Sequence, residues 1–252
     1  IDFLIVGTRV GVDSISPSLT VNLGDIDPNE TVVAQWLMVS SLQGKFVEYS
    51  ASYEHVDGLG DPRLSLIENL EIHETEHVVR GDYPDDLLPD FLTNNVPDVD
   101  NLPDRVYFSD GTDLPVTVYT ADAVSVDGEI SVADNTVVLT LNEVPAGWFY
   151  VRTEDPAHHL FKLVSVTRSD GQPIRVSENA WTTHRVIRPK DADPYDQDRL
   201  HLFDYGGTGQ YLLTYAASDT ENPVVASLDA EDVIAGGYET HDFTVTFTDD
   251  VA

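Results

Sequence analysis

The 252-residue sequence contains no cysteine, so disulfide bonds and thiolate metal ligands are excluded. It has no apolar run near the roughly 18 residues that a membrane-spanning helix needs, and we therefore expect no membrane insertion. Bases are scarce: 13 Lys and Arg stand against 45 Asp and Glu, which gives a formal net charge of −32. Phosphates repel such a surface, so we expect no nucleic acid among the partners.

Aspartate supplies most of the acidity. The acids comprise 31 Asp and 14 Glu, and Asp suits turns and the ligation of hard cations better than it suits helices. Such a composition is typical of three situations: a halophilic or marine origin, calcium loading, or a surface that favours solubility. The scarcity of lysine, with 3 residues, favours the first two.

Apolar and polar residues alternate with the period of two that predicts β-strands. Turn signals rich in Gly, Asp and Pro separate the runs, and short strands at such spacing are typical of β-sandwiches. The sequence therefore predicts an all-β fold of tandem sandwich domains. Eight runs carry the pattern: SLTVNLG, TVVAQWLMV, KFVEYSASY, NTVVLTL, WFYVRT, HLFKLVSVTR, QYLLTYAA and HDFTVTFTD.

The predicted organisation has four parts. A first β-sandwich covers 1–81, and an acidic linker rich in Asp and Pro covers 82–104, where we expect extended and loosely packed chain. A second β-sandwich covers 105–217. The last part, 218–252, holds about two strands, which are too few for a stable sandwich. Either that domain is truncated, or its strands are exchanged with a neighbour.

Two stretches resemble known bacterial modules. SPSLTVNLGDIDPNETVVAQWLMV is similar to immunoglobulin-like modules of the NEW3 and CARDB kind. ENPVVASLDAEDVIAGGYETHDFTVTFTDDVA resembles the start of tandem immunoglobulin-like repeats in giant bacterial surface proteins. The resemblance implies immunoglobulin-like β-sandwiches and a structural role in a secreted or cell-surface protein, as a stalk, a filament subunit or an adhesin segment. It implies no catalytic residue, and we expect no enzyme.

The stretch HETEH, from His73 to His77, fits the pattern H-E-x-x-H, which on a helix binds zinc and supplies the general base of metalloproteases. Residues four apart can converge on one ion from a helix, whereas on a strand they lie roughly 13 Å apart. The run LEIHETEHVV alternates as a strand does, although it has no Gly or Pro that would exclude a helix. The third histidine of the extended pattern is missing, because Arg80 and Tyr83 occupy those places. We predict a solvated strand face; a zinc peptidase with Glu74 as its base is the alternative.

Two acidic runs, DVDNLPD and DADPYDQD, suggest calcium, which takes six to eight oxygen ligands, often from closely spaced carboxylates. Neither run matches an EF-hand loop, and the alternative is a solvated loop. The candidate ligands are Asp98, Asp100, Asp104, Asp191, Asp193, Asp196 and Asp198.

Three aromatic residues are candidates for binding surface glycans. Trp148, Phe149 and Tyr150 are consecutive, so on a strand they point to alternating faces. One face belongs to the core, and the other could present Trp148 and Tyr150 to a sugar, joined by Trp181. Packing within the core is the favoured interpretation of all three candidates.

No motif of nucleophilic catalysis or phosphate binding occurs, since the sequence has no G-x-S-x-G elbow and no glycine-rich loop before a helix. The pair His158–His159 lies beside Asp155 and predicts a polar turn.

Charge is distributed unevenly along the chain. Six of the 13 bases lie between Lys162 and Lys190, whereas 219–252 has nine acids and no base. These regions could attract one another across a domain or subunit contact, and unpaired strand edges invite strand addition. The expected partners are other copies of the chain or adjacent immunoglobulin-like domains. Head-to-tail assembly and completion of the last domain in cis both remain open.

Overall fold

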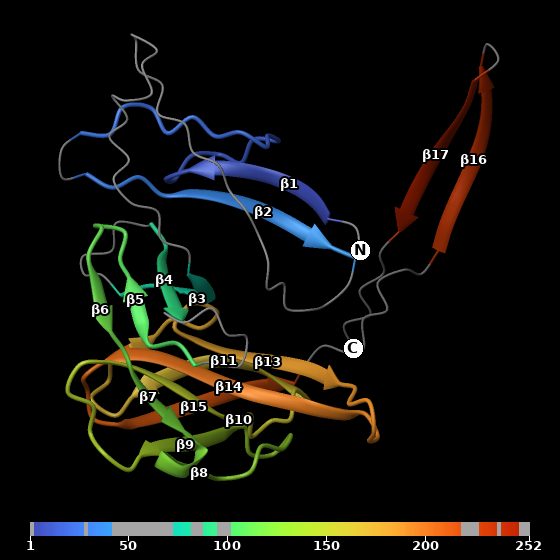
Figure 1. The fold of residues 1–252 in the computed structure, drawn as a ribbon. Coiled ribbons are helices and arrows are strands. Elements are labelled where there is room, and N and C mark those ends of the chain that lie inside the picture. Colours follow the sequence, from blue (N-terminus) through green and yellow to red (C-terminus); the bar gives the residue numbers. More distant parts are fainter. Residues whose placement is uncertain are drawn as a thin grey trace.

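The computed structural model describes residues 3–27, 30–41, 73–81, 88–94, 102–217, 227–235 and 238–246. Strands make up the regular structure of these residues, together with one 3-10 turn, η2 (Ala121–Ala123) (Figure 1). The predicted all-β class is confirmed.

Two sheets pack against each other between residues 117 and 217. The first has the strand order β13-β14-β10-β7, in which β10 and β7 are parallel and the other neighbours antiparallel. The second has the order β12-β11-β15-β9-β8 and is antiparallel throughout. The strands of the first sheet are β7 (Thr117–Thr120), β10 (Trp148–Glu154), β13 (Ala180–Ile187) and β14 (Tyr195–Tyr205). Those of the second are β8 (Val124–Asp127), β9 (Thr136–Leu141), β11 (Phe161–Arg168), β12 (Pro173–Ile174) and β15 (Gln210–Ala217).

A third sheet covers the opposite face of the first one. Its order is β3-β4-β5-β6, with all neighbours antiparallel. In Figure 1 it lies over the strands of the two-sheet body. Its strands are β3 (Glu74–Val79), β4 (Asp90–Asn94), β5 (Arg105–Tyr107) and β6 (Asp113–Pro115).

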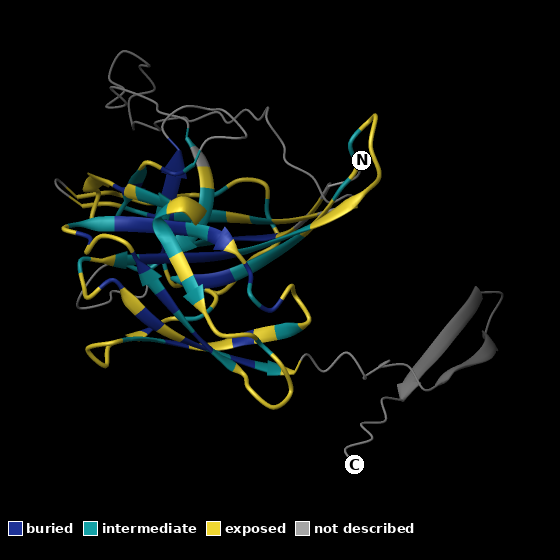
Figure 2. Ribbon diagram, turned by 90° about the horizontal axis from the view of Figure 1, so that it is seen from below, coloured by how far each residue is buried: buried dark blue, intermediate teal, exposed yellow. Residues whose placement is uncertain are grey.

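Strand β10 shows how the three layers share their cores. Side chains alternate across a strand, so Phe149 and Val151 enter the core between the first and second sheets, while Tyr150 enters the core beneath the third. All three are fully buried. A central strand covered on both faces reads as a continuous apolar run, which explains the sequence WFYV. In Figure 2 the buried residues lie mainly on strands in the interior of the described body.

The prediction of a loosely packed linker at 82–104 is wrong for the residues that the structure describes there. Strand β4 is largely buried, and Leu92 is inaccessible to solvent. The buried carboxylate of Asp90 accepts hydrogen bonds from the backbone N–H of Gly81 at 2.6 Å and of Ser109 at 2.8 Å. The acidic composition of this range predicted a linker, but it contains the short strand β4, whose buried Asp90 accepts hydrogen bonds from backbone N–H groups. Strands β3 and β4 therefore pack with the body that follows them.

Within 1–81, the range of the first predicted sandwich, the structure describes 3–27, 30–41 and 73–81. Strands β1 (Phe3–Val10) and β2 (Ala34–Ser40) form a two-stranded antiparallel sheet. The strand predicted from SLTVNLG is wrong: this stretch has irregular backbone, and the indole N–H of Trp36 donates to the Leu19 carbonyl at 3.0 Å instead. The run KFVEYSASY lies outside the described residues.

The last part of the chain contains the two strands that the sequence predicts. β16 (Ser227–Ala235) and β17 (Tyr238–Thr246) pair antiparallel in a sheet of their own. The register places Leu228 opposite Val245 and Ala230 opposite Phe243. A two-stranded sheet is marginally stable in water without further packing.

Candidate functional site

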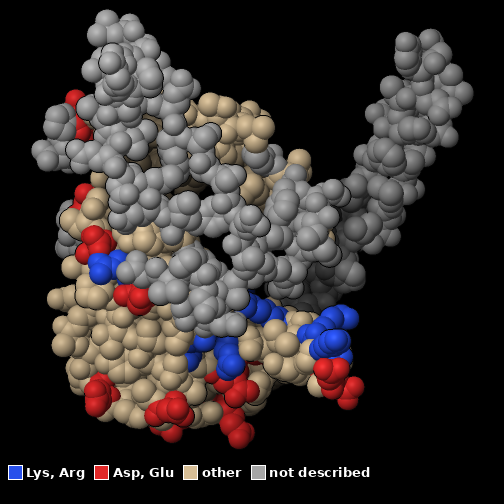
Figure 3. Space-filling model, in the orientation of Figure 1, with Lys and Arg blue, Asp and Glu red and all other residues tan. Residues whose placement is uncertain are grey.

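A cleft of about 510 Å³ lies where the third sheet meets strand ends and turns of the other two sheets. Chain segments from all three sheets reach it, and three of its side chains are arginines. On the face shown in Figure 3, several Lys and Arg side chains lie close together on the lower part of the described body, with Asp and Glu beside them. The residues that line the cleft are Arg80, Gly81, Trp148, Arg168, Gln172, Pro173, Ile174, Arg175, Asn179, Asp204 and Tyr205.

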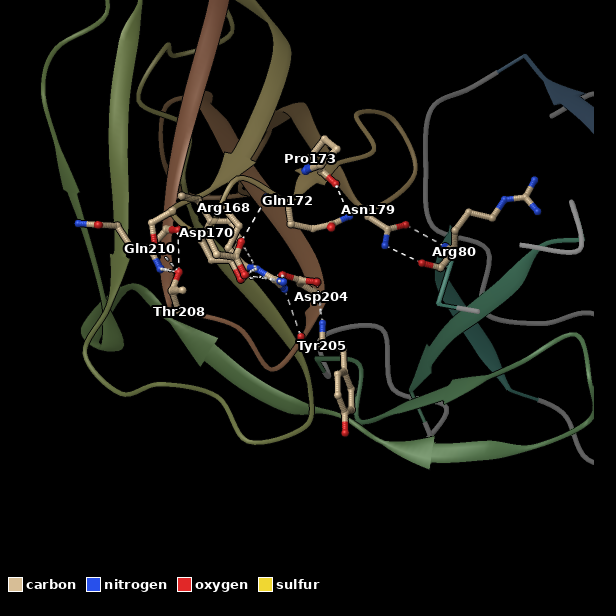
Figure 4. Close-up of polar contacts among 12 residues, drawn as sticks. Arg80, Arg168, Asp170, Gln172, Pro173, Asn179, Asp204, Tyr205, Thr208 and Gln210 are labelled. Atoms are coloured by element: carbon tan, nitrogen blue, oxygen red, sulfur yellow. Dashed lines mark hydrogen bonds and ion pairs between the residues drawn. The ribbon is translucent and has the colours of Figure 1, made fainter. Parts of the chain in front are cut away.

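Arg168, at the end of β11, lines the cleft and pairs with two carboxylates. Its guanidinium donates to both carboxylate oxygens of Asp170 at 2.9 and 3.0 Å, and to Oδ2 of Asp204 at 3.0 Å. Figure 4 shows these three side chains meeting. The hydrogen bonds to Asp170, and the nearby charge of Asp204, raise the pKa of Arg168 above its ordinary value, and the same pairing lowers the pKa of the Asp170 carboxyl. Tyr211 adds a hydrogen bond from its hydroxyl to Asp204 at 2.8 Å.

Asn179 connects the third sheet to the turn before β13. Its side-chain amide donates to the Arg80 carbonyl at 2.6 Å and accepts from the Arg80 N–H at 2.8 Å (Figure 4). The guanidinium of Arg80 lies 3.5 Å from the carboxylate of Glu178, which also pairs with Arg175 at 3.4 Å. Each arginine of the cleft thus has a carboxylate partner, so the cleft is locally charge-balanced within a strongly acidic protein.

Of the three aromatic candidates for glycan binding, one lines this cleft. Trp148 is half-buried, with its ring stacked on Phe203 at 5.0 Å between centroids and an edge contact to Tyr205, also at 5.0 Å. Tyr205 is 55% exposed. Tyr150 and Trp181, by contrast, are 0% and 8% exposed and belong to the core beneath the third sheet. Their rings therefore face protein on both sides, as the favoured interpretation, packing within the core, predicts.

A polar cluster is buried beside these aromatics. The imidazole of His201 lies 2.6 Å from the Tyr150 hydroxyl and 2.8 Å from the Thr183 hydroxyl, and it stacks on Trp181 at 4.8 Å. Burial, followed by the positive charge of Arg152, lowers the pKa of His201 to about 3. Burial also raises the pKa of the Tyr150 hydroxyl above its ordinary value. No local sequence pattern indicates this cluster, because its members come from three strands.

The HETEH stretch lies on a strand from Glu74 onward, as predicted, because Glu74 is the first residue of β3. The prediction of a solvated face is wrong at His77, whose side chain packs against other residues. The two histidines have separate partners. Nε2 of His73 lies 3.0 Å from the Tyr107 hydroxyl, whereas Nε2 of His77 lies 3.0 Å from the Ser177 carbonyl oxygen and its ring stacks on Trp181 at 3.8 Å. The helical geometry that a zinc peptidase needs is therefore absent from this stretch. Burial lowers the pKa of His77, in keeping with its role as a packed side chain.

The candidate calcium ligands do not come together among the described residues. Asp98 and Asp100 lie outside those residues, and Asp104 is exposed just before β5. Asp191 and Asp193 lie in the connection between β13 and β14.

The acidic loop predicted over 191–198 is in part a strand. Asp196 and Asp198 belong to β14, opposite Val186 and His184 on β13. Asp198 instead joins His159 and His184 in the group of metal-ligating side chains that the described residues do bring together, with all ligand atoms within 4.8 Å of one another.

The predicted polar turn at His158–His159 is confirmed. Both residues lie in the turn between β10 and β11, with left-handed φ values of 46° and 55°. The sequence identified the turn but not the side chain of His184, which reaches it from β13.

Comparisons with protein-family models, with curated proteins and with solved structures find no match to the chain. The resemblance to immunoglobulin-like surface modules therefore remains a prediction from the sequence. Within the described part of the chain, no helix combines the length and the apolar character needed to cross a membrane.

Proposed function

We propose that the chain is a structural module of a secreted or cell-surface protein, with immunoglobulin-like domains that serve as a stalk, a filament subunit or an adhesin segment. The described body supports this proposal. Three β layers enclose two apolar cores, and such packing resists deformation, because well-packed interiors have low compressibility. The surrounding acidity keeps the surface soluble.

The observation that carries the proposal is the pair of two-stranded sheets that flank the body in sequence. In the N-terminal sheet, Leu4, Met38 and Val39 are 66%, 58% and 56% exposed. In the C-terminal sheet, the strands β16 and β17 pair with each other alone among the described strands. A two-stranded sheet gains stability when a further strand or sheet covers it. Neighbouring β structure, from another copy or an adjacent domain, is the partner that supplies such a strand.

Light scattering across a range of protein concentrations tests this proposal. We expect the mass to rise above that of one chain as the concentration increases. The variant Phe243→Thr with Val245→Thr keeps the charge and the strand propensity but removes two apolar side chains, and it should weaken association by roughly tenfold or more. The matched control, Thr244→Ser with Thr246→Ser, should associate as the parent does. The mass of a single chain at millimolar concentration, with calcium present, would refute self-assembly.

A second function is favoured by the cleft: recognition of a neutral saccharide. Sugars stack on aromatic rings and take hydrogen bonds from paired polar groups, and the cleft offers Trp148 and Tyr205 beside charge-balanced arginines. Tyr205→Ala should lower the affinity for the glycan that binds best on an array. Tyr195→Ala is the matched control, because Tyr195 is similarly exposed, at 52%, but does not line the cleft. An array without hits would dismiss this function.

A further inference from the structure

Two strands place a histidine and an aspartate side by side at the outer end of the first sheet. His184 on β13 and Asp198 on β14 are direct partners in the antiparallel register, so their side chains lie on the same face. Nδ1 of His184 is 2.8 Å from Oδ1 of Asp198. This is the face whose inner positions, Ala180 and Leu200, belong to the main core. The pair therefore lies on a rigid sheet, just beyond the core.

A turn held by a buried carboxylate delivers the third side chain. Asp155 is fully buried, and its carboxylate accepts hydrogen bonds from the Tyr215 hydroxyl at 2.9 Å and from the backbone N–H of Ala157 and His159 at 3.2 and 3.1 Å. These bonds hold His158 and His159 in left-handed backbone that non-glycine residues seldom adopt. As a result the imidazole of His159 lies over His184, with ring centroids 3.8 Å apart, and its Nδ1 is 3.6 Å from Oδ1 of Asp198.

The spacing of these atoms matches a metal centre. Zinc bonds to histidine nitrogen and carboxylate oxygen are about 2.0–2.2 Å long, so ligand atoms in a tetrahedral site lie about 3.3 Å apart. The contacts of Asp198 Oδ1 to the two histidines, at 2.8 and 3.6 Å, bracket that value. The side chain of Asp198 is 10% exposed, that of His184 34% and that of His159 51%. One side of the group is thus open to an ion and to a water that completes its coordination.

We propose that His159, His184 and Asp198 bind one divalent first-row transition-metal ion, such as Zn²⁺. Imidazole ligands suit zinc and its neighbours, whereas calcium takes oxygen ligands only, so this ligand set differs from that of the predicted calcium site, although Asp198 is a candidate ligand in both. The bound ion would tie the β10–β11 turn to the β13–β14 hairpin. A protein of net charge −32 also concentrates cations near its surface.

Zinc titration of the metal-free full chain by calorimetry, paired with thermal melts, tests this site. The variant His159→Asn removes a ligand and retains a residue type that tolerates left-handed backbone. His158→Asn is the matched control, because His158 has the same backbone conformation but contacts Glu154 instead. A second ligand variant, His184→Gln, tests the strand side of the site.

We expect the parent chain and His158→Asn to bind one equivalent of zinc at this site. The ligand variants His159→Asn and His184→Gln should lose this equivalent or bind it at least about tenfold more weakly. Zinc should raise the melting temperature of the parent and of His158→Asn more than that of the two ligand variants. Calcium should leave the difference in melting temperature between the parent and His159→Asn unchanged. Equal zinc uptake and equal melting shifts in His158→Asn and His159→Asn would overturn the proposal.

Discussion

The burial of a neutral histidine beneath the third sheet should make the protein sensitive to acid. His201 is 3% exposed, and a neutral imidazole satisfies both of its hydroxyl neighbours, Tyr150 and Thr183, because one ring nitrogen donates and the other accepts. The positive charges of Arg152, Arg185 and Arg199 oppose protonation, as does His77.

The sign of the effect follows from the depressed pKa. The pKa of His201 is about 3 in the folded chain, against an ordinary value of 6.5. The unfolded chain therefore binds a proton at pH values where the folded chain does not, so stability is lost as the pH falls from 6.5 towards 3. One pH unit corresponds to about 1.4 kcal/mol for one proton, which amounts to about 2 kcal/mol between pH 7 and pH 5.

Urea denaturation of the parent and of His201→Gln, at pH 7, 6 and 5, measures this contribution. Other titrating groups are common to both proteins and cancel in the difference. The stability difference in favour of the parent should shrink by about 2 kcal/mol between pH 7 and pH 5. Parallel pH profiles of the two proteins would refute the reasoning, because His201 would then titrate alike in the folded and unfolded chains.

Three further predictions concern the packing. Leu92→Ala should lower the free energy of unfolding by about 2–5 kcal/mol in chemical denaturation, because β4 is part of a core. The control Leu160→Ala, at a side chain 67% exposed, should change it by less than about 0.5 kcal/mol. Equal effects of the two substitutions would favour the loosely packed linker. Asp155→Ala should cost about 3 kcal/mol or more, because it leaves a buried hydroxyl and two turn N–H groups without their acceptor, and an unchanged urea midpoint would contradict the turn geometry. Arg168→Lys should lower the melting temperature by several degrees, because an ammonium cannot replace the forked contacts to Asp170 and Asp204. An unchanged melting temperature would mean that these contacts do not contribute to stability.

Sequence alternation predicted strands well where one face of the strand is buried and the other is not. QYLLTYAA became β15 with the same bounds, Gln210–Ala217, and NTVVLTL became β9 with one residue fewer. Strands β1, β13 and β14 are not among the eight predicted runs. At the start of β14, acidic residues project beyond the core, where no apolar period is needed. Strand β4 was assigned to a linker for a different reason: the run around it is rich in Asp and Pro, and its buried Asp90 accepts backbone hydrogen bonds instead of facing solvent.

The candidate sites depend on contacts that no local pattern records. Asn179 meets Arg80 across 99 positions of sequence, and His184 meets Asp198 only through the register of a hairpin. The aromatic triplet around Phe149 could be assigned to a strand, but the sequence does not show that a third sheet covers its second face. That sheet buried Tyr150 and Trp181 and left Trp148 at the cleft.

Hydrogen–deuterium exchange of the β16 and β17 amides, measured at low and at high protein concentration, tests most directly whether neighbouring β structure completes this module. Exchange of a hydrogen-bonded amide slows when its strand is stabilised. We expect the protection of residues 227–246 to increase with concentration, while that of β10 and β14 stays constant. Equally fast exchange of the hairpin at both concentrations would contradict it.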